Sequence, residues 1–347
     1  MHGIKRLAQH LDISIGTVSR ALNGRPDVSE ATRKRVLDAA ENLGYVANQS
    51  GRSLRQGVTN AVGFMVELNF ETAPNSDNFF MSVFAGVARS LSASNLDLIV
   101  LPCTTDNDPT EYLRRVIGRG MVDGVILSAT QRNDPRIEIL TRAGVPFVLL
   151  GRSETPGDYP WMDLDFEDYV DTSVARLAGL GHQRIALAVP TTGINLKYVL
   201  TKRYRTAMKR HGLTVDRELI LPTRSNEGGG YELVDRLLGL PEPPTAVILS
   251  YELMAVGLYH RLDELGLVPG RDLSVIGLRE SAQSRSLFPR LTCYRINLMD
   301  LGLALGDALR ATMPIDGGRR AAQPPLRKLW PMELILGESD RPPVRAP

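Results

Sequence analysis

Five neighbouring residues near the start of the chain could recognise a nucleic acid. Thr17 and Ser19 carry hydroxyl groups that can hydrogen-bond phosphate oxygens, and Arg20 can reach a phosphate or the edge of a guanine. Ile15 and Gly16 precede them, and the small Gly16 allows a close approach to base edges. This combination is typical of a DNA-contacting helix. The competing interpretation is a small structural bundle whose arginines are simply solvated.

The rest of the chain lacks the patterns of an enzyme or a metal site. The glycines at 228–230 have neither the Gly-x-Gly-x-x-Gly spacing nor the preceding strand of a dinucleotide site, so we expect them to open a helix. No Gly-x-Ser-x-Gly elbow is present, and the five histidines lack metal-ligand spacing. We expect His182 to be structural and Cys103 and Cys293 to be buried thiols. We therefore predict no catalysis, no metal and no cofactor.

Three short helices must position the candidate DNA-contacting residues. Ser14 and Ser29 can cap the second and third helices, and the breaker residues at 23–26 separate the two. The apolar residues at helical spacing, expected to face a common core, are Ile4, Leu7, Ala8 and Leu11, then Ile15, Val18 and Leu22, then Val36, Leu37, Ala40 and Leu43. With a three-residue turn between the first two helices, this pattern predicts a helix-turn-helix unit.

These segments resemble the signature of the lactose-repressor (LacI/GalR) family in register. The matching runs are 4–8 (IKRLA), 13–24 (ISIGTVSRALNG), 28–33 (VSEATR) and 43–45 (LGY), followed by Asn48 and 52–54 (RSL). Three positions depart from the family pattern. Arg6 stands where the family usually has an acid, Asp12 where it usually has Gly or Asn, and Gly51 where it usually has Ala. The predicted DNA-binding residues are Ile15, Gly16, Thr17, Ser19, Arg20, Asn23, Ser29, Asn48, Arg52 and Leu54.

Residues 47–57 are polar, and Leu54 is their only large apolar side chain. The resemblance implies a hinge that folds into a short helix on operator DNA, with Leu54 wedged into a minor-groove base step. Leu54 could instead pack against the nearest domain. Gly51 should make the hinge helix less favourable by roughly 0.5–1 kcal/mol relative to alanine.

The remainder of the chain alternates apolar strands with amphipathic helices, which predicts parallel α/β sheets in two lobes. The resemblance continues to about residue 338. It implies two lobes like those of periplasmic sugar-binding proteins, with crossovers near 160–164, 290–294 and 322–327, and a ligand in the cleft between them.

The predicted organisation has four parts. They are a helix-turn-helix unit at 1–46, a hinge at 47–57, a two-lobed effector-binding and dimerisation unit at 58–340, and a tail at 341–347. We expect the N-lobe to comprise about 58–161 and 293–323, and the C-lobe about 164–290 and 326–338.

Eight residues are predicted to bind the effector in the cleft: Phe79, Phe80, Asp165, Asn195, Lys197, Tyr198, Glu252 and Arg279. The aromatic pair suits the C–H faces of a sugar, although it could equally belong to the core. Glu252 stands at the family's effector-binding acid, where its oxygens can accept two hydroxyls, or it only begins a helix. Arg279 could meet an acidic ligand or pair with the neighbours of Glu280.

The cleft departs from the family pattern at two places. Leu200 and Arg203 replace the usual Arg and Gly of an Arg-x-x-Gly-Tyr-Arg motif, and 278–280 (LRE) replaces Phe-Asp-Asp. The effector therefore need not be a sugar bound by well-studied relatives.

The net charge of +2 conceals an uneven distribution. Residues 1–57 carry +4 and the other 290 residues carry −2, a pattern typical of a basic nucleic-acid-binding head on a soluble body. No apolar run of about 18 residues is present, and the first 25 residues lack a signal-peptide core. We expect a cytoplasmic protein without a membrane partner.

Together these features predict a sequence-specific transcriptional regulator that binds double-stranded operator DNA. The favoured form is a homodimeric or tetrameric repressor, released by a sugar or sugar derivative, on a pseudo-palindromic operator. The alternatives are a corepressor-type regulator, a ligand-binding protein without a DNA role, and an α/β enzyme, for which no catalytic constellation is visible.

Overall fold

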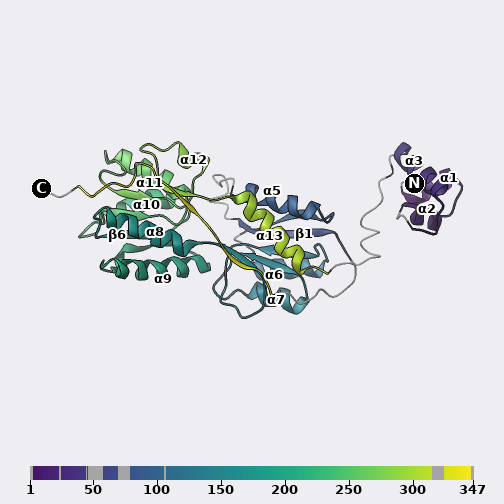
Figure 1. Cartoon of the computed structure of the whole chain (residues 1–347), viewed down its shortest axis with the longest axis horizontal. Coiled ribbons are helices and arrows are strands. Elements are labelled where there is room, and N and C mark those ends of the chain that lie inside the picture. Colours follow the sequence, from purple (N-terminus) through teal and green to yellow (C-terminus); the bar gives the residue numbers. More distant parts are fainter. Residues whose placement is uncertain are drawn as a thin grey trace. The chain divides into compact units, whose positions relative to one another are not determined.

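The computed structural model describes residues 3–22, 25–43, 45, 58–68, 79–104, 107–314 and 324–344. The chain forms two units, Met1–Thr59 and Asn60–Pro347 (Figure 1).

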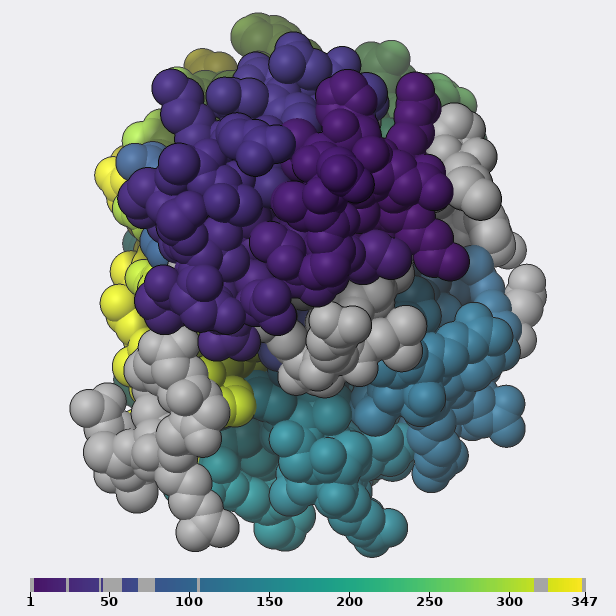
Figure 2. All heavy atoms as spheres, turned by 90° about the vertical axis from the view of Figure 1, so that its right-hand side faces the viewer, coloured from purple at the N-terminus to yellow at the C-terminus, as the bar shows by residue number. Residues whose placement is uncertain are grey.

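The first unit contains three helices, α1 (Ile4–Leu11), α2 (Ile15–Leu22) and α3 (Glu30–Asn42). The predicted caps are confirmed, since the Ser14 hydroxyl accepts the Thr17 amide at 3.1 Å and the Ser29 hydroxyl accepts the Thr32 amide at 3.3 Å. The core consists of Leu7, Ala8, Val18, Ala21, Val28, Val36, Ala39 and Ala40. Figure 2 shows the space-filling surface of this unit in purple.

Two residues predicted for this core lie on the surface instead. Ile15 is 44% exposed and Leu37 is 48% exposed. Successive helix residues are rotated by about 100°. The buried face of α2 is therefore centred on Val18 and Ala21, about a quarter turn away from Ile15. In the same way, the burial of Ala39 turns the buried face of α3 away from Leu37. Small alanines, and not the large apolar residues, fill these helix contacts.

The second unit contains two lobes, each built on a parallel sheet, which confirms the predicted α/β class. The N-lobe sheet has the order β11-β5-β4-β3-β1-β2. Its strands are β1 (Ala61–Leu68), β2 (Asp97–Thr104), β3 (Gly124–Leu127), β4 (Phe147–Leu150), β5 (Trp161–Leu164) and β11 (Arg327–Trp330). Its helices are α5 (Phe79–Ser92), α6 (Pro109–Gly118), α7 (Pro135–Ala143) and α13 (Leu298–Thr312).

The C-lobe sheet has the order β7-β6-β8-β9. Its strands are β6 (Ile185–Pro190), β7 (Ile220–Thr223), β8 (Ala246–Ile248) and β9 (Ser274–Ile276). The helices of this lobe are α8 (Phe166–Gly179), α9 (Asn195–Arg210), the 3-10 helix η2 (Arg217–Leu219), α10 (Glu227–Leu238), α11 (Leu253–Glu264) and α12 (Ala282–Arg285). The glycines at 228–230 lie in the first turn of α10, as predicted.

The chain crosses between the lobes at three places, and the third differs from the prediction. The first crossing follows β5, and the second runs through β10 (Cys293–Arg295), which pairs antiparallel with β12 (Glu333–Ile335). The expected third crossing at 322–327 is wrong, because Arg327–Trp330 pairs in parallel with β5 in the N-lobe sheet. The chain therefore crosses after β11. This strand begins with two charged, exposed residues, so it lacked the apolar signature of the buried strands.

Helices α5 and α13 pack side by side (Figure 1) through glycines on both partners. A Cβ placed on Gly86 would collide with the Met299 carbonyl oxygen, and one on Gly302 would collide with the Val83 carbonyl oxygen. The two backbones thus approach too closely for any larger residue.

We expect Gly86→Ala to lower the free energy of unfolding by about 1–3 kcal/mol, since the helices must separate to fit the methyl group. Urea denaturation followed by circular dichroism measures the change. Gly118→Ala is the matched control, because a Cβ at that position would meet no described atom within 4 Å apart from its chain neighbours and its own helix backbone. Equal denaturation midpoints for Gly86→Ala and the parent would contradict this packing.

Candidate functional site

The candidate DNA-contacting residues are displayed along α2. Ile15, Gly16 and Arg20 are exposed, whereas Thr17 and Ser19 are half-buried. The Arg20 guanidinium lies 3.3 Å from the Asp27 carboxylate. Ser29 is exposed at the start of α3. The other predicted DNA-binding residues, Asn23, Asn48, Arg52 and Leu54, lie outside the described residues.

The glycine of α2 is not required by packing. A Cβ at Gly16 would meet the Ser14 hydroxyl at 3.7 Å and the Arg20 guanidinium at 3.8 Å, which are ordinary van der Waals contacts. A glycine inside a helix costs about 0.5–1 kcal/mol relative to alanine. The contacts within this unit therefore do not explain the glycine at position 16.

A cavity of about 160 Å³ lies between the two lobes of the second unit. The lining residues are Phe79, Phe80, Ser128, Ala129, Thr130, Leu150, Gly151, Arg152, Asp163, Leu164, Phe166, Ile194, Asn195 and Leu196. Three predicted effector residues, Phe79, Phe80 and Asn195, are among them. The two rings meet edge to face with centroids 5.2 Å apart, and Phe80 also packs on Phe64 of the core.

Arg152 is the charged centre of the cavity wall. Its Nε donates to the Asp163 carboxylate on β5 at 2.8 Å, and its Nη atoms donate to the Glu167 carboxylate on α8 at 2.9 and 2.7 Å. Burial raises the pKa of Asp163 to about 6, and the nearby guanidinium opposes this rise. Because β5 belongs to the N-lobe and α8 to the C-lobe, Arg152 joins the lobes electrostatically.

The predicted acid Asp165 does not line the cavity. It caps α8, accepting the Asp168 amide at 3.0 Å, whereas Asp163 faces the cavity two residues earlier. Sequence reasoning missed both Arg152 and Asp163. The sequence does offer a signal for both. Asp163 lies inside an apolar strand and Arg152 lies just after one, and a charge in such a buried position needs a partner.

Asn195 joins the lobes at the edge of the same cavity. Its side-chain amide donates to the Arg152 carbonyl oxygen at 2.9 Å, and its backbone amide donates to the Thr130 carbonyl oxygen at 2.9 Å. Lys197 is half-buried and does not line the cavity. Tyr198 is exposed, and its ring centroid lies 4.8 Å from the Arg132 guanidinium carbon of the other lobe.

Glu252 and Arg279 form a buried ion pair beside Phe79. A guanidinium nitrogen lies 2.7 Å from the carboxylate, and the side chains are 3% and 7% exposed, respectively. The Arg279 guanidinium carbon lies 5.3 Å from the Phe79 ring centroid. Burial raises the pKa of Glu252 to about 7 and lowers that of Arg279 to about 10. Arg279 thus pairs with Glu252, and neither residue lines the cavity.

The remaining candidates have structural roles. His182 is buried, with its ring nitrogens 2.8 Å from the Thr245 hydroxyl and 2.8 Å from the Arg341 carbonyl oxygen. Cys103 and Cys293 are buried free thiols, as predicted. Among the described residues, no cluster of His, Cys, Asp and Glu could hold a metal ion. Nor does the described part of the chain contain a helix long and apolar enough to cross a membrane.

Two family models match the chain. Residues 4–48 match the model of bacterial regulatory proteins of the lacI family, and residues 174–339 match the periplasmic binding protein-like domain. The first match covers the helix-turn-helix unit, and the second lies within the two-lobed unit.

Relatives extend this similarity over the whole chain. The HTH-type transcriptional regulator AglR of Rhizobium meliloti is 32% identical, covering 99% of this chain and 96% of its own length. RafR of Escherichia coli is 35% identical over 78% of this chain and 79% of its own. The structure of a transcriptional regulator CelR–cellobiose complex is 25% identical, with a TM-score of 0.70 over 98% of this chain and 100% of its own. The lac repressor dimer bound to operator shares the fold, with 20% identity and a TM-score of 0.79 over 96% and 98% of the two chains. The chain therefore belongs to the lacI family of bacterial regulatory proteins, and it is a DNA-binding transcriptional regulator.

Proposed function

We propose that this regulator is a repressor released from its operator by a sugar or sugar derivative bound between the lobes. It acts on DNA in the cytoplasm, by binding and not by catalysis. The observation that carries the proposal is the cavity whose wall includes Arg152 and Asn195, because both residues contact both lobes. A ligand there can change how the lobes meet.

The chemistry of the cavity suits a polyhydroxylated ligand. Asp163, Arg152 and Asn195 offer acceptors and donors, while Phe79 and Phe80 offer aromatic faces for C–H surfaces. Two structurally similar regulators are recorded with a sugar, one as a cellobiose complex and one with bound ribose. These observations support a neutral mono- or disaccharide, or a glycoside, as the effector.

Release from DNA would follow as a shift between two conformations. The sugar stabilises one arrangement of the lobes, the hinge at 47–57 loses its DNA-bound order, and Leu54 leaves the minor groove. If sugar weakens operator binding by a given factor, operator must weaken sugar binding by the same factor. The proposed DNA contacts remain those predicted for α2, Asn23, Ser29 and the hinge.

A thermal-shift screen of mono- and disaccharides and glycosides tests the proposal. We expect at least one sugar to raise the melting temperature, and the same sugar to release an operator duplex selected from a randomised library. A sugar that binds and strengthens operator binding would identify a corepressor-type regulator. No stabilising sugar in the panel would count against a sugar effector.

We also propose that the regulator is a homodimer formed through the N-lobe. Strand β2 is an edge strand, with Ile99 36% and Val100 43% exposed, and Met81 on the adjoining α5 is 64% exposed. An exposed apolar edge of this kind is a site for a partner. Two heads on one duplex also require a two-fold arrangement.

We expect Ile99→Asp to convert the dimer into monomers, because it would bury two like charges at the shared edge. Analytical ultracentrifugation measures the change. Operator affinity should fall in parallel, since two linked heads bind more tightly than one. Thr206→Asp, which adds a charge to the exposed side of α9, is the control. An Ile99→Asp variant that sediments like the parent would contradict this interface.

A further inference from the structure

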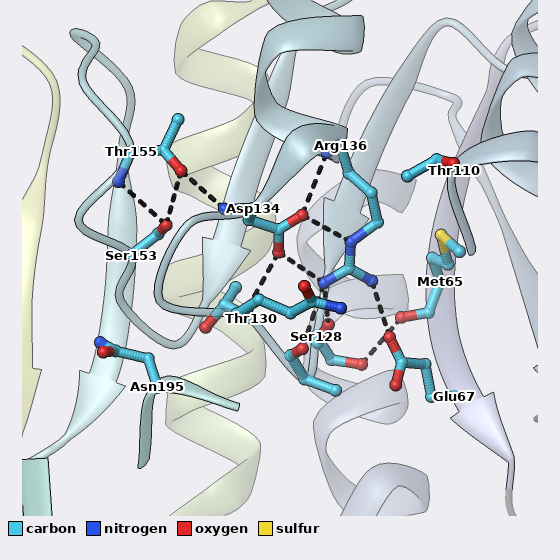
Figure 3. Close-up of polar contacts among 12 residues, drawn as sticks. Met65, Glu67, Thr110, Ser128, Thr130, Asp134, Arg136, Ser153, Thr155 and Asn195 are labelled. Atoms are coloured by element: carbon cyan, nitrogen blue, oxygen red, sulfur yellow. Dashed lines mark hydrogen bonds and ion pairs between the residues drawn. The ribbon is translucent and has the colours of Figure 1, made fainter. Parts of the chain in front are cut away.

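A buried guanidinium lies beneath one wall of the cavity. The Arg136 side chain, in the first turn of α7, is 1% exposed. Its Nε and Nη2 donate to the two carboxylate oxygens of Asp134 at 2.9 and 2.7 Å, and its Nη1 donates to Glu67 on β1 at 3.2 Å. Figure 3 shows Arg136 pointing between these two acids. The three residues form what we call the Arg136 cluster.

The Arg136 cluster holds the loop that follows β3. Nη2 of Arg136 donates to the carbonyl oxygens of Ser128 and Ala129, both at 3.1 Å. Ala129 has a φ of 51°, a left-handed conformation that is unfavourable for a residue with a side chain. Asp134 accepts the Gln131 amide at 3.1 Å. The loop therefore keeps a strained shape because buried charged groups bind its backbone on the inner side.

The same loop faces both the cavity and the other lobe. Ser128, Ala129 and Thr130 line the cavity. The pairs that the loop makes across the lobe boundary are Thr130 with Asn195, Gln131 with Ile194, and Arg132 with Tyr198. These contacts require residues 128–132 to keep their place, and the Arg136 cluster binds two carbonyl oxygens and one amide of this loop.

Stability alone does not account for this buried charge. Replacing a buried ion pair by well-packed apolar residues is often neutral or stabilising. The neighbouring α7 residues Ile137 and Leu140 are buried in the apolar core of the lobe. The charged groups instead provide directed hydrogen bonds to particular carbonyls.

We propose that Arg136 is a positioning residue for lobe closure. It touches no ligand, and it sets the loop at 128–132 so that the C-lobe can dock on it. The inference deepens the proposed function, because this loop is a wall of the proposed effector cavity. It also makes a prediction that needs no ligand.

The test is hydrogen exchange of the full chain without ligand, read by mass spectrometry. In Arg136→Met/Asp134→Ser the serine still caps α7 while the charge pair is removed. We expect the peptide containing Ile194 and Asn195, on the opposite lobe, to exchange at least tenfold faster than in the parent. Peptides from β3 should exchange as in the parent. Arg136→Lys keeps the charge without the planar fork, so an intermediate rate is expected.

Leu140→Ala is the matched control, since it removes a buried side chain from the same helix without touching the loop. At equal loss of melting temperature, it should leave exchange at 194–195 unchanged. Equal acceleration in this control, or a parental rate in the double variant, would overturn the inference. If the double variant does not fold, exchange at 194–195 is measured in Arg136→Lys instead. A parental exchange rate in that variant would overturn the inference.

A second arm separates this inference from the proposed function. Thermal shifts with cellobiose and ribose are measured for the parent and each folded variant. If neither sugar stabilises the parent, the sugar class is in question while the exchange result still decides the role of Arg136. If one sugar does, its shift should shrink in the double variant and persist in Leu140→Ala.

Discussion

Replacing Arg152 with methionine is expected to weaken binding of the sugar identified by the screen by about 30-fold or more, or about 2 kcal/mol. The guanidinium forms ion pairs with both Asp163 from the N-lobe and Glu167 from the C-lobe. Without it, lobe closure would bring two carboxylates together across the cavity, and like charges in a partly buried site repel. Isothermal titration calorimetry measures the loss.

The matched control is Arg142→Met, whose side chain is 82% exposed on α7 and pairs with Glu138. It removes the same charge far from the cavity wall, so affinity should stay at the parental value. An unchanged sugar affinity in Arg152→Met would contradict a role for Arg152 in sugar binding. A pH series adds a further check. Burial raises the pKa of Asp163 to about 6 while Arg152 opposes it, so the variant's pKa should lie higher still.

The sign of this pH effect follows from linkage. A carboxyl with a higher pKa in the folded chain than in the unfolded chain stabilises the fold at low pH, and that contribution is lost as pH rises through the folded pKa. Arg152→Met should therefore lose more stability than the parent between pH 5 and pH 8. Adding Asp163→Asn should abolish the extra loss.

Replacing Arg20 with alanine is expected to weaken operator binding by about 1–3 kcal/mol per half-site. Arg20 lies on the exposed face of α2, and its ion pair with Asp27 joins side chains that are 51% and 60% exposed. Such surface pairs stabilise the folded chain by only about 0–1 kcal/mol, so breaking this ion pair to contact DNA costs little free energy. Filter binding or fluorescence anisotropy over a range of salt concentrations measures the change.

Arg35→Ala is the control, because it removes the same charge from an exposed position of α3. If Arg20 reads a base, its variant should also lose discrimination between operator and random duplex. If it contacts a phosphate, the salt dependence should become shallower by about one unit per half-site. Identical binding curves for the Arg20 variant and Arg35→Ala would contradict the placement of the DNA surface on α2.

Local chemistry made the three helices of the first unit predictable. Ser14 and Ser29 cap helices through their own hydroxyls, so these boundaries depend on only a few neighbouring residues. Ile15 and Leu37 were misplaced because burial depends on how the three helices pack, which periodicity does not specify. In the N-lobe sheet, β11 does not follow from the apolar pattern because it begins with two charged, exposed residues, and its pairing with β5 joins segments more than 160 residues apart.

The cavity was harder to predict for the same reason. Family resemblance predicts Phe79 and Phe80, whereas Asn195 was predicted because Leu200 and Arg203 depart from the family motif; all three residues line the cavity. The acid facing the cavity is Asp163 and not Asp165, because strand β5 continues to Leu164 and the next residue turns away to cap α8. Arg152 matters through partners contributed by a strand and a helix from different lobes. The spacing of these three residues along the chain does not predict that they come together.

Operator affinity measured with and without a bound sugar decides whether a sugar releases this regulator from DNA. The full-length parent is titrated against its selected operator at fixed salt, first alone and then with a saturating concentration of a sugar shown by thermal shift to bind. The proposed release mechanism predicts at least a tenfold rise in the operator dissociation constant, and a fall in sugar affinity by the same factor when operator is saturating. A sugar that binds in the cleft and leaves operator affinity unchanged would contradict it.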